Sequence, residues 1–144
     1  MGTRENILAS LSTRLATTTD VVTVKRSLLS DFELKRYTRA QLPLVVVVEP
    51  DEPEHEYKGS QHSVVHLDVA VLLIYEQWNW DGTGPAQVNG LRDNVINKIH
   101  ADIKNSNNSH NTSVKGVSTV KKTFPIFTDQ IKVRIDYYQS YLVR

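Results

Sequence analysis

Hydrophobic and charged residues alternate strictly over residues 131–137 of this 144-residue chain. Because successive side chains of a β-strand point to opposite faces, the alternation predicts a strand with one buried and one exposed face. The buried face is predicted to hold Ile131, Val133 and Ile135, and the exposed face Lys132, Arg134 and Asp136.

A continuous apolar run at residues 44–48, Leu-Val-Val-Val-Val, predicts another strand. Such runs are typical of strands buried on both faces, and Pro43 and Pro50 bound this one. Residues 49–61 are predicted to be a proline-broken loop, which together with the strand after it forms one long arm of a hairpin. Further strands are predicted at residues 21–24, 64–75, 114–124 and 129–142.

Two segments have apolar residues at helical spacing. Residues 4–17 place Ile7, Leu8, Leu11 and Leu15 on one stripe and predict an amphipathic helix. Residues 86–104 predict the main core helix, with its stripe at Val88, Leu91, Val95, Ile96, Ile99 and Ile103. The polar tract that follows, residues 105–111, has no apolar side chain to bury and is predicted to be a mobile loop.

These elements predict a single α+β domain over residues 1–144. Its core is one mostly antiparallel sheet packed on one face by the helix at residues 86–104, with a further helix at the N-terminus. A chain of this length buries roughly 68–70% of its unfolded surface, which is enough for an independent core.

Composition excludes several classes of chemistry. The chain has no cysteine, which rules out disulfides, thiol catalysis and thiolate-ligated metals. Its longest apolar run, residues 69–74, is far shorter than the roughly 20 residues that a membrane-spanning helix needs, and no apolar signal-peptide core is present. We therefore expect a soluble protein inside the cell. A net charge of +1 argues against a dedicated nucleic-acid binder.

The charge is unevenly distributed. Residues 49–60 carry five acidic groups and one basic group, whereas residues 1–48 carry seven basic and four acidic groups, and residues 121–144 carry five basic and two acidic groups. A local acidic block of this kind is either solvated or complements a neighbouring protein or a second copy of the chain.

The acidic block superficially resembles a metal-dependent nuclease, which uses carboxylates to hold a divalent ion and a lysine to polarise water. Asp51, Glu56 and Lys58 are the matching residues. Nuclease carboxylates normally come from two adjacent strands, whereas these two lie close together in one loop. Glu54, His55, Glu56 and His62 are poor metal ligands as a set because three of them are consecutive. No metal site is predicted.

Other motifs indicate structure more strongly than chemistry. Gly82-Thr83-Gly84 precedes the main helix but lacks the further residues of a phosphate-binding loop, so it predicts a turn and a helix entry. His66 and His100 have no recognisable serine or cysteine partner and are interpreted as structural. Trp78 and Trp80 share a face, and either pack under the helix or form a contact surface.

The order of the predicted elements carries a resemblance to a known family. It runs from an amphipathic helix and a short strand, through Leu42-Pro43 into an apolar strand, to a long strand at residues 66–71. A helix with Leu91, Val95, Ile99 and Asp102 and a closing strand with Val133 and Ile135 complete it. Over nearly the whole chain, this order resembles the tail terminator proteins of tailed bacteriophages, and the related neck and tail-completion proteins.

The resemblance implies a structural function. Members of that family are small α+β subunits that form a ring, typically hexameric, on the end of the tail tube, stop its polymerisation and offer a docking surface to the head connector. The implied partners are further copies of the chain, the tail tube protein and the head connector or neck protein, without membrane or sequence-specific nucleic acid. The implied location is the virion, with the host cytoplasm during assembly.

The expected function thus involves no catalytic residue, no cofactor and no metal. The residues predicted to form interfaces are Glu52, Glu54, Glu56, Trp78, Trp80, Lys132 and Arg134. Two alternatives remain open: a metal-dependent hydrolase or nuclease that uses the acidic residues 49–58, and a small module that binds a ligand or peptide through Trp78 and Trp80.

Overall fold

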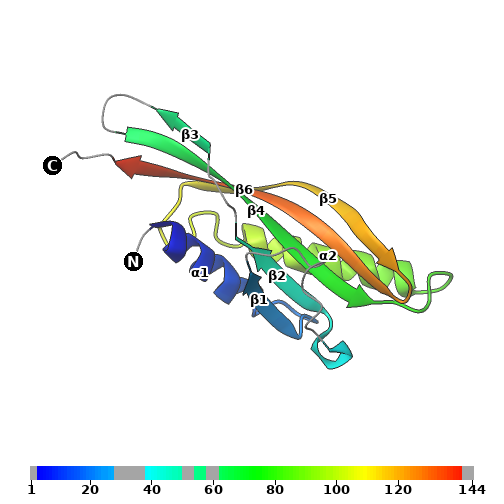
Figure 1. The fold of residues 1–144 in the computed structure, drawn as a ribbon. Helices are drawn as coiled ribbons and strands as arrows, with labels where there is room; N and C mark the ends of the chain where they lie inside the picture. Colours follow the sequence, from blue (N-terminus) through cyan, green and yellow to red (C-terminus); the bar gives the residue numbers. More distant parts are fainter. Residues whose placement is uncertain (1–2, 28–37, 50–53, 58–61, 141–144) are drawn as a thin grey trace.

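The computed structural model shows two α-helices and a twisted β-sheet (Figure 1), and it describes residues 3–27, 38–49, 54–57 and 62–140. In chain order the elements are α1 (Thr3–Leu15), β1 (Thr23–Ser27), the 3-10 helix η1 (Arg39–Gln41), β2 (Leu44–Val48), β3 (Glu54–Tyr57), β4 (His62–Glu76), α2 (Gly84–His100), β5 (Asn111–Thr123) and β6 (Ile126–Ser140).

The described strands form one sheet with the order β1-β2-β4-β6-β5, and β3 pairs with β4 beyond the end of β2. β1 is parallel to β2, whereas all the other pairs are antiparallel. The centre of the sheet is the long pairing of β4 with β6, which runs from His62 opposite Ser140 to Glu76 opposite Ile126. The predicted α+β fold with a mostly antiparallel sheet is confirmed.

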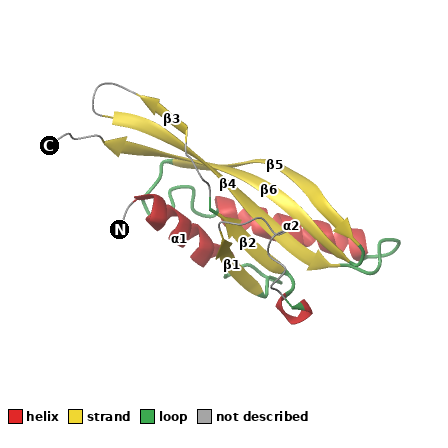
Figure 2. Cartoon of the chain, viewed as in Figure 1, coloured by secondary structure: helices red, strands yellow, loops and turns green. Residues whose placement is uncertain are grey.

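Both helices cover the same face of the sheet and build the main core with it (Figure 2). The helices contribute apolar stripes at helical spacing, and the strands contribute every second residue. The helical residues are Ile7, Leu8, Leu11, Leu15, Val88, Leu91, Val95 and Ile99, and the central strand residues are Val65, Leu67, Val69, Val71, Leu73, Ile131, Val133, Ile135 and Tyr137.

Arg14 joins the two helices. Its guanidinium donates hydrogen bonds to the carbonyl oxygens of Lys98, at 2.9 Å, and Ile99, at 3.0 Å. These carbonyls lie in the last turn of α2, where a cation also interacts favourably with the helix dipole. The N-terminal helix is therefore held in place by polar contacts as well as by its apolar stripe.

The strand at β6 confirms the predicted facing. Ile131, Val133 and Ile135 are at most 1% exposed on the helix side, whereas Lys132 is exposed and Arg134 is half-buried on the opposite side. Asp136 also faces that side, but its side chain is only 16% exposed because it pairs with His66, so its predicted exposure is wrong. Strand β2 is buried on both faces, as predicted, because a second, smaller apolar cluster lies on the side away from the helices. That cluster consists of Leu44, Val46, Leu72 and Ile74.

The molecule is elongated, with different elements at its two ends (Figure 1). At one end, β3 and the adjoining parts of β4 and β6 extend as an arm beyond the helices. At the other end lie the turn between β4 and α2 and the hairpin between β5 and β6. No described helix is long and apolar enough to cross a membrane.

Several predicted boundaries are wrong. The first strand starts at Thr23 instead of residue 21 and continues to Ser27, because its partner strand β2 sets the pairing. Glu54–Tyr57 form a strand inside the segment that was predicted to be a loop, because the hairpin with β4 provides hydrogen-bonding partners. Helix α2 ends at His100, so Ile103 lies beyond it and is 41% exposed rather than buried.

The polar tract at residues 105–111 was predicted to be a mobile loop with nothing to bury, and the burial of one of its residues contradicts the second part of that prediction. Asn105 is fully buried, and its amide donates hydrogen bonds to the hydroxyls of Thr112, at 2.8 Å, and Ser109, at 3.0 Å. Asp102 accepts from the backbone amide of Ser106 at 2.8 Å, which lowers the pKa of that carboxyl. These hydrogen bonds attach the tract to the start of β5, although Oδ1 of the buried Asn105 has no hydrogen-bond partner among the described residues.

Candidate interaction surfaces

The polar face of the sheet carries the predicted residues Lys132 and Arg134. Arg134 donates two hydrogen bonds to the carboxylate of Asp68, at 2.9 and 3.2 Å, across the β4–β6 pairing. Lys115 of β5 lies beside them, at the edge of a cavity of about 550 Å³. Lys132 and Arg134 therefore share a surface. Asp68 largely neutralises the charge of Arg134, whereas no carboxylate among the described residues pairs with Lys132.

His66 lies in the next row of the same face. Its Nδ1 is 2.5 Å from Oδ1 of Asp136, which is directly opposite it on β6. Both side chains are more than four-fifths buried, so this pair links the strands at the base of the arm. His100 accepts a hydrogen bond from the backbone amide of Val114 at 3.3 Å. Both histidines have structural contacts, in keeping with their interpretation from the sequence.

Trp78 and Trp80 belong to an aromatic cluster at the end of the molecule opposite the arm. Trp78 packs edge-on against Phe124 with ring centroids 5.3 Å apart, and Trp80 packs edge-on against Phe127 at 5.0 Å. Phe124 also contacts Phe127 at 6.4 Å. Trp78 and Phe124 are 60% and 57% exposed, so the cluster presents a large apolar surface to solvent.

Arg39 and Glu76 position Trp78. Arg39 forms a two-pronged ion pair with Glu76 and lies 5.9 Å from the centre of the Trp78 ring. Glu76 also accepts a hydrogen bond from the indole nitrogen at 2.5 Å. The ion pair with Arg39, followed by the indole, lowers the pKa of Glu76. Trp78 is thus fixed in an exposed position, which suits a contact residue.

The sequence did not reveal that Phe124, Phe127 and Arg39 belong to this cluster. These residues come from segments far apart in the chain, and the pairing of Glu76 with Ile126 brings two of the segments together. The available signal was the pair of aromatic residues beside Pro125, in the turn between the last two strands.

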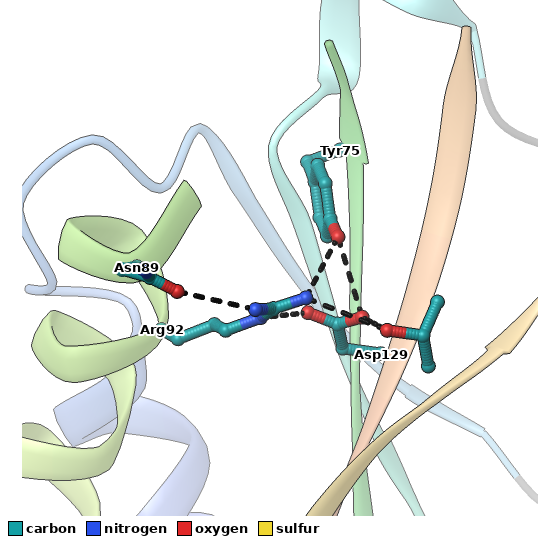
Figure 3. A network of polar contacts seen from close by, with 5 residues as sticks. Tyr75, Asn89, Arg92 and Asp129 are labelled. Carbon is teal, nitrogen blue, oxygen red and sulfur yellow. Dashed lines mark hydrogen bonds and ion pairs between the residues drawn. The ribbon is translucent and has the colours of Figure 1, made fainter. Parts of the chain in front are cut away.

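A buried polar network lies between α2 and the sheet (Figure 3). Asp129 is fully buried and accepts hydrogen bonds from Arg92, from Tyr75 at 3.3 Å and from Thr119 at 2.8 Å. Arg92 also donates to Tyr75 and to Asn89 of its own helix. Pairing with Asp129 raises the pKa of Arg92, and burial raises the pKa of Tyr75 to about 12. These groups satisfy one another and anchor the helix to three strands.

A groove of about 430 Å³ runs between α2 and the edge strand β5. Ile96 and Asp93 line its helix side, and Val117, Ser118 and Thr119 line its strand side. Val117 is 41% exposed although its neighbour in β6, Ile131, is fully buried. The sequence did not indicate this groove, because the groove depends on how α2 crosses the edge of the sheet at β5.

Two of the acidic residues predicted to form an interface lie in β3. Glu54 and Glu56 are in β3, in register with His66 and Val64 of β4, whereas Glu52 lies outside the described residues. Within the part of the chain that the structure describes, no group of three or more potential ligands could hold a metal ion.

Comparison with protein-family models finds no match to the chain, and no curated protein matches it.

Proposed function

We propose that this protein is a tail terminator of a tailed bacteriophage, whose subunits form a hexameric ring on the end of the tail tube. In that position the ring stops tube polymerisation and provides the surface that joins the tail to the head. The proposal is based on the resemblance in element order, and it is supported by the distribution of surfaces over the fold.

The observation that carries the proposal is that unlike surfaces lie at opposite ends of an elongated subunit. One end presents the exposed aromatic cluster of Trp78 and Phe124, and the other presents the acidic arm at β3. A closed ring requires each subunit to use two different patches, one against each neighbour. A ring that joins two structures also needs separate surfaces for the tube and for the head connector.

The surfaces support different contacts. The arm extends beyond the helices, so it can reach a neighbouring subunit. The aromatic cluster is an exposed apolar surface. Aromatic residues are enriched among the interface residues that contribute most to binding. We assign the arm to contacts between subunits and the aromatic cluster to contact with the tube or the connector.

The function can be tested by mixing the purified protein with tail tube protein from the same phage during polymerisation. Electron microscopy should show tubes that end in a ring, and added protein should shorten the tubes. Trp78→Ala combined with Phe124→Ala should weaken capping without loss of folding. Tubes that grow to the same length and have bare ends at saturating protein would refute the proposal.

A second candidate, a module that binds a peptide or small ligand, is favoured by the same exposed aromatic cluster. It predicts a soluble complex of one subunit with one ligand, whose formation depends on Trp78 but not on a tube. Equal binding to tube ends and to unpolymerised tube protein, with no ring, would favour this second candidate.

A further inference from the structure

We infer that the groove between α2 and β5 binds the β3 strand of a second copy of this chain, which extends the sheet from one subunit to the next. The inference deepens the proposed function, on which it rests, by assigning the contact between neighbouring subunits in the ring. It follows from three features of β5 and β3.

The first feature is an edge that fits a short strand. β5 is the last described strand on its side of the sheet, and its pairing with β6 is irregular at Lys115 and Val120. Between these two irregular positions, residues 116–119 form a regular stretch of four residues, and β3 is also four residues long. Irregularities of this kind protect most of an edge strand from unwanted pairing and leave this stretch available.

The second feature is the groove itself. An exposed sheet edge with a helix beside it is an arrangement in which an extended segment adds to the sheet and places alternate side chains against the helix. Here the groove is lined by Ile96 and the exposed Val117, with Asp93 at its rim. β3 contains His55 and Tyr57, so an added β3 strand would bring a histidine and an aromatic residue to the groove.

The third feature is charge. β5 contains three lysines and no acidic residue, whereas β3 contains two glutamates and no lysine or arginine. Lys115, Lys121 and Lys122 have no carboxylate partner among the described residues. Lys115 lines the polar face and the register places Lys121 in it, opposite the buried Thr128 of β6. In β3, Glu54 and Glu56 are in register with His66 and Val64 of β4.

The two strands lie at opposite edges of the sheet, because the order across the arm and the centre is β3-β4-β6-β5. Pairing of β3 from one subunit with β5 of the next is therefore a head-to-tail contact, which closes into a ring when the rotation between subunits permits. The same contact would place the glutamates of one copy beside the lysines of β5 of its neighbour.

The test is an exchange of charge between the two strands. Glu54→Lys with Glu56→Lys, and separately Lys115→Glu with Lys121→Glu, should each weaken subunit association by roughly tenfold. Mixing these two variants should restore association between them, because each supplies the partner that the other lacks. Native mass spectrometry and sedimentation measure the assemblies. Association unchanged in either variant, or failure of the mixture to recover it, would overturn the inference.

A peptide covering residues 49–61 provides a readout that does not depend on ring formation. Fluorescence anisotropy should show binding of the labelled peptide to the full-length protein, with slower amide exchange at residues 116–119. Val117→Asp should abolish binding, whereas Ile103→Asp, at a position with the same 41% exposure outside the groove, should not. Equal effects of the two substitutions, or no binding to the wild-type protein, would overturn the inference.

These measurements separate the inference from the proposed function. If the wild-type protein and the charge variants cap tail tubes equally well, strand pairing is refuted and the tail terminator function stands. If the wild-type protein binds the peptide in the groove but leaves tubes uncapped, the tail terminator function is refuted and strand pairing stands.

Discussion

Arg92 on α2 forms an ion pair with Asp129 on β6, and the carboxylate of Asp129 is fully buried (Figure 3). Removal of one partner of a buried pair leaves an uncompensated charge, so Arg92→Met should lower the free energy of unfolding by about 3–5 kcal/mol. The ion pair of Arg39 with Glu76 provides the control because the Arg39 side chain is 65% exposed, and Arg39→Met should lower the free energy of unfolding far less. Urea denaturation measures both, and similar losses would show that Asp129 does not depend on Arg92.

The same network predicts a pH dependence at alkaline pH. Burial, followed by the charge of Asp129, raises the pKa of Tyr75 from its ordinary value of 10.0 to about 12. The folded protein thus favours the neutral phenol, and this contribution to stability is complete below about pH 10 and is lost as the pH rises towards 12. Tyr75→Phe should show a smaller decrease in Tm between pH 10 and 12 than the wild type. Parallel Tm curves would place the alkaline transition elsewhere.

The two faces of β6 predict opposite sensitivities to truncation. Val133 is 1% exposed, so Val133→Ala should destabilise the protein by about 1–3 kcal/mol through lost burial and a small cavity. Lys132 is exposed, and Lys132→Ala should cost less than about 0.5 kcal/mol. Chemical denaturation of the two variants tests the facing, which equal losses would contradict.

Local patterns predicted the elements whose partners lie in the core. The alternation over residues 131–137 gave the correct facing because one side of β6 meets the helices, and the periodic stripe of α2 was correct up to Ile99. The end of α2 was missed because Ile103 continues the apolar spacing although the chain turns at Ala101. The buried Asn105 was missed because its burial depends on a hydroxyl acceptor, Thr112, on the following strand.

The candidate surfaces were less predictable than the fold. Trp78 and Trp80 were identified as a pair, but the cluster depends on Phe124, which is brought beside Trp78 by the pairing of β4 with β6. The groove at Val117 depends on the crossing of α2 over the edge of the sheet. Hydrophobic periodicity indicates whether a residue is buried, but it does not indicate which distant segment of the chain covers that residue.

Two glycines of α2 should respond to alanine in opposite ways. A Cβ at Gly84 would lie 1.4 Å from the carbonyl oxygen of Asn79, so Gly84→Ala must displace the turn that carries Trp78 and Trp80 and should cost about 1–3 kcal/mol. A Cβ at Gly90 would meet no atom within 4 Å, and Gly90→Ala should stabilise the helix by roughly 0.5–1 kcal/mol. Thermal unfolding of both variants checks the sign, and a stable Gly84→Ala variant would contradict the turn geometry.

The acidic residues of the arm should control assembly. Reversal of Glu52, Glu54 and Glu56 to lysine should weaken ring formation and leave the fold intact, as judged by circular dichroism. Charges at the rim of an interface act mainly on association rate and are screened by salt, so the defect should be largest at low ionic strength. Unchanged hexamers of the triple variant in native mass spectrometry would exclude the arm from the interface.

The most direct test of the proposed function is electron microscopy of tail tubes assembled with and without the purified protein. The account predicts tubes that stop growing and carry one ring of six subunits on an end. Tubes with bare ends, or a single subunit bound to each end, would contradict it.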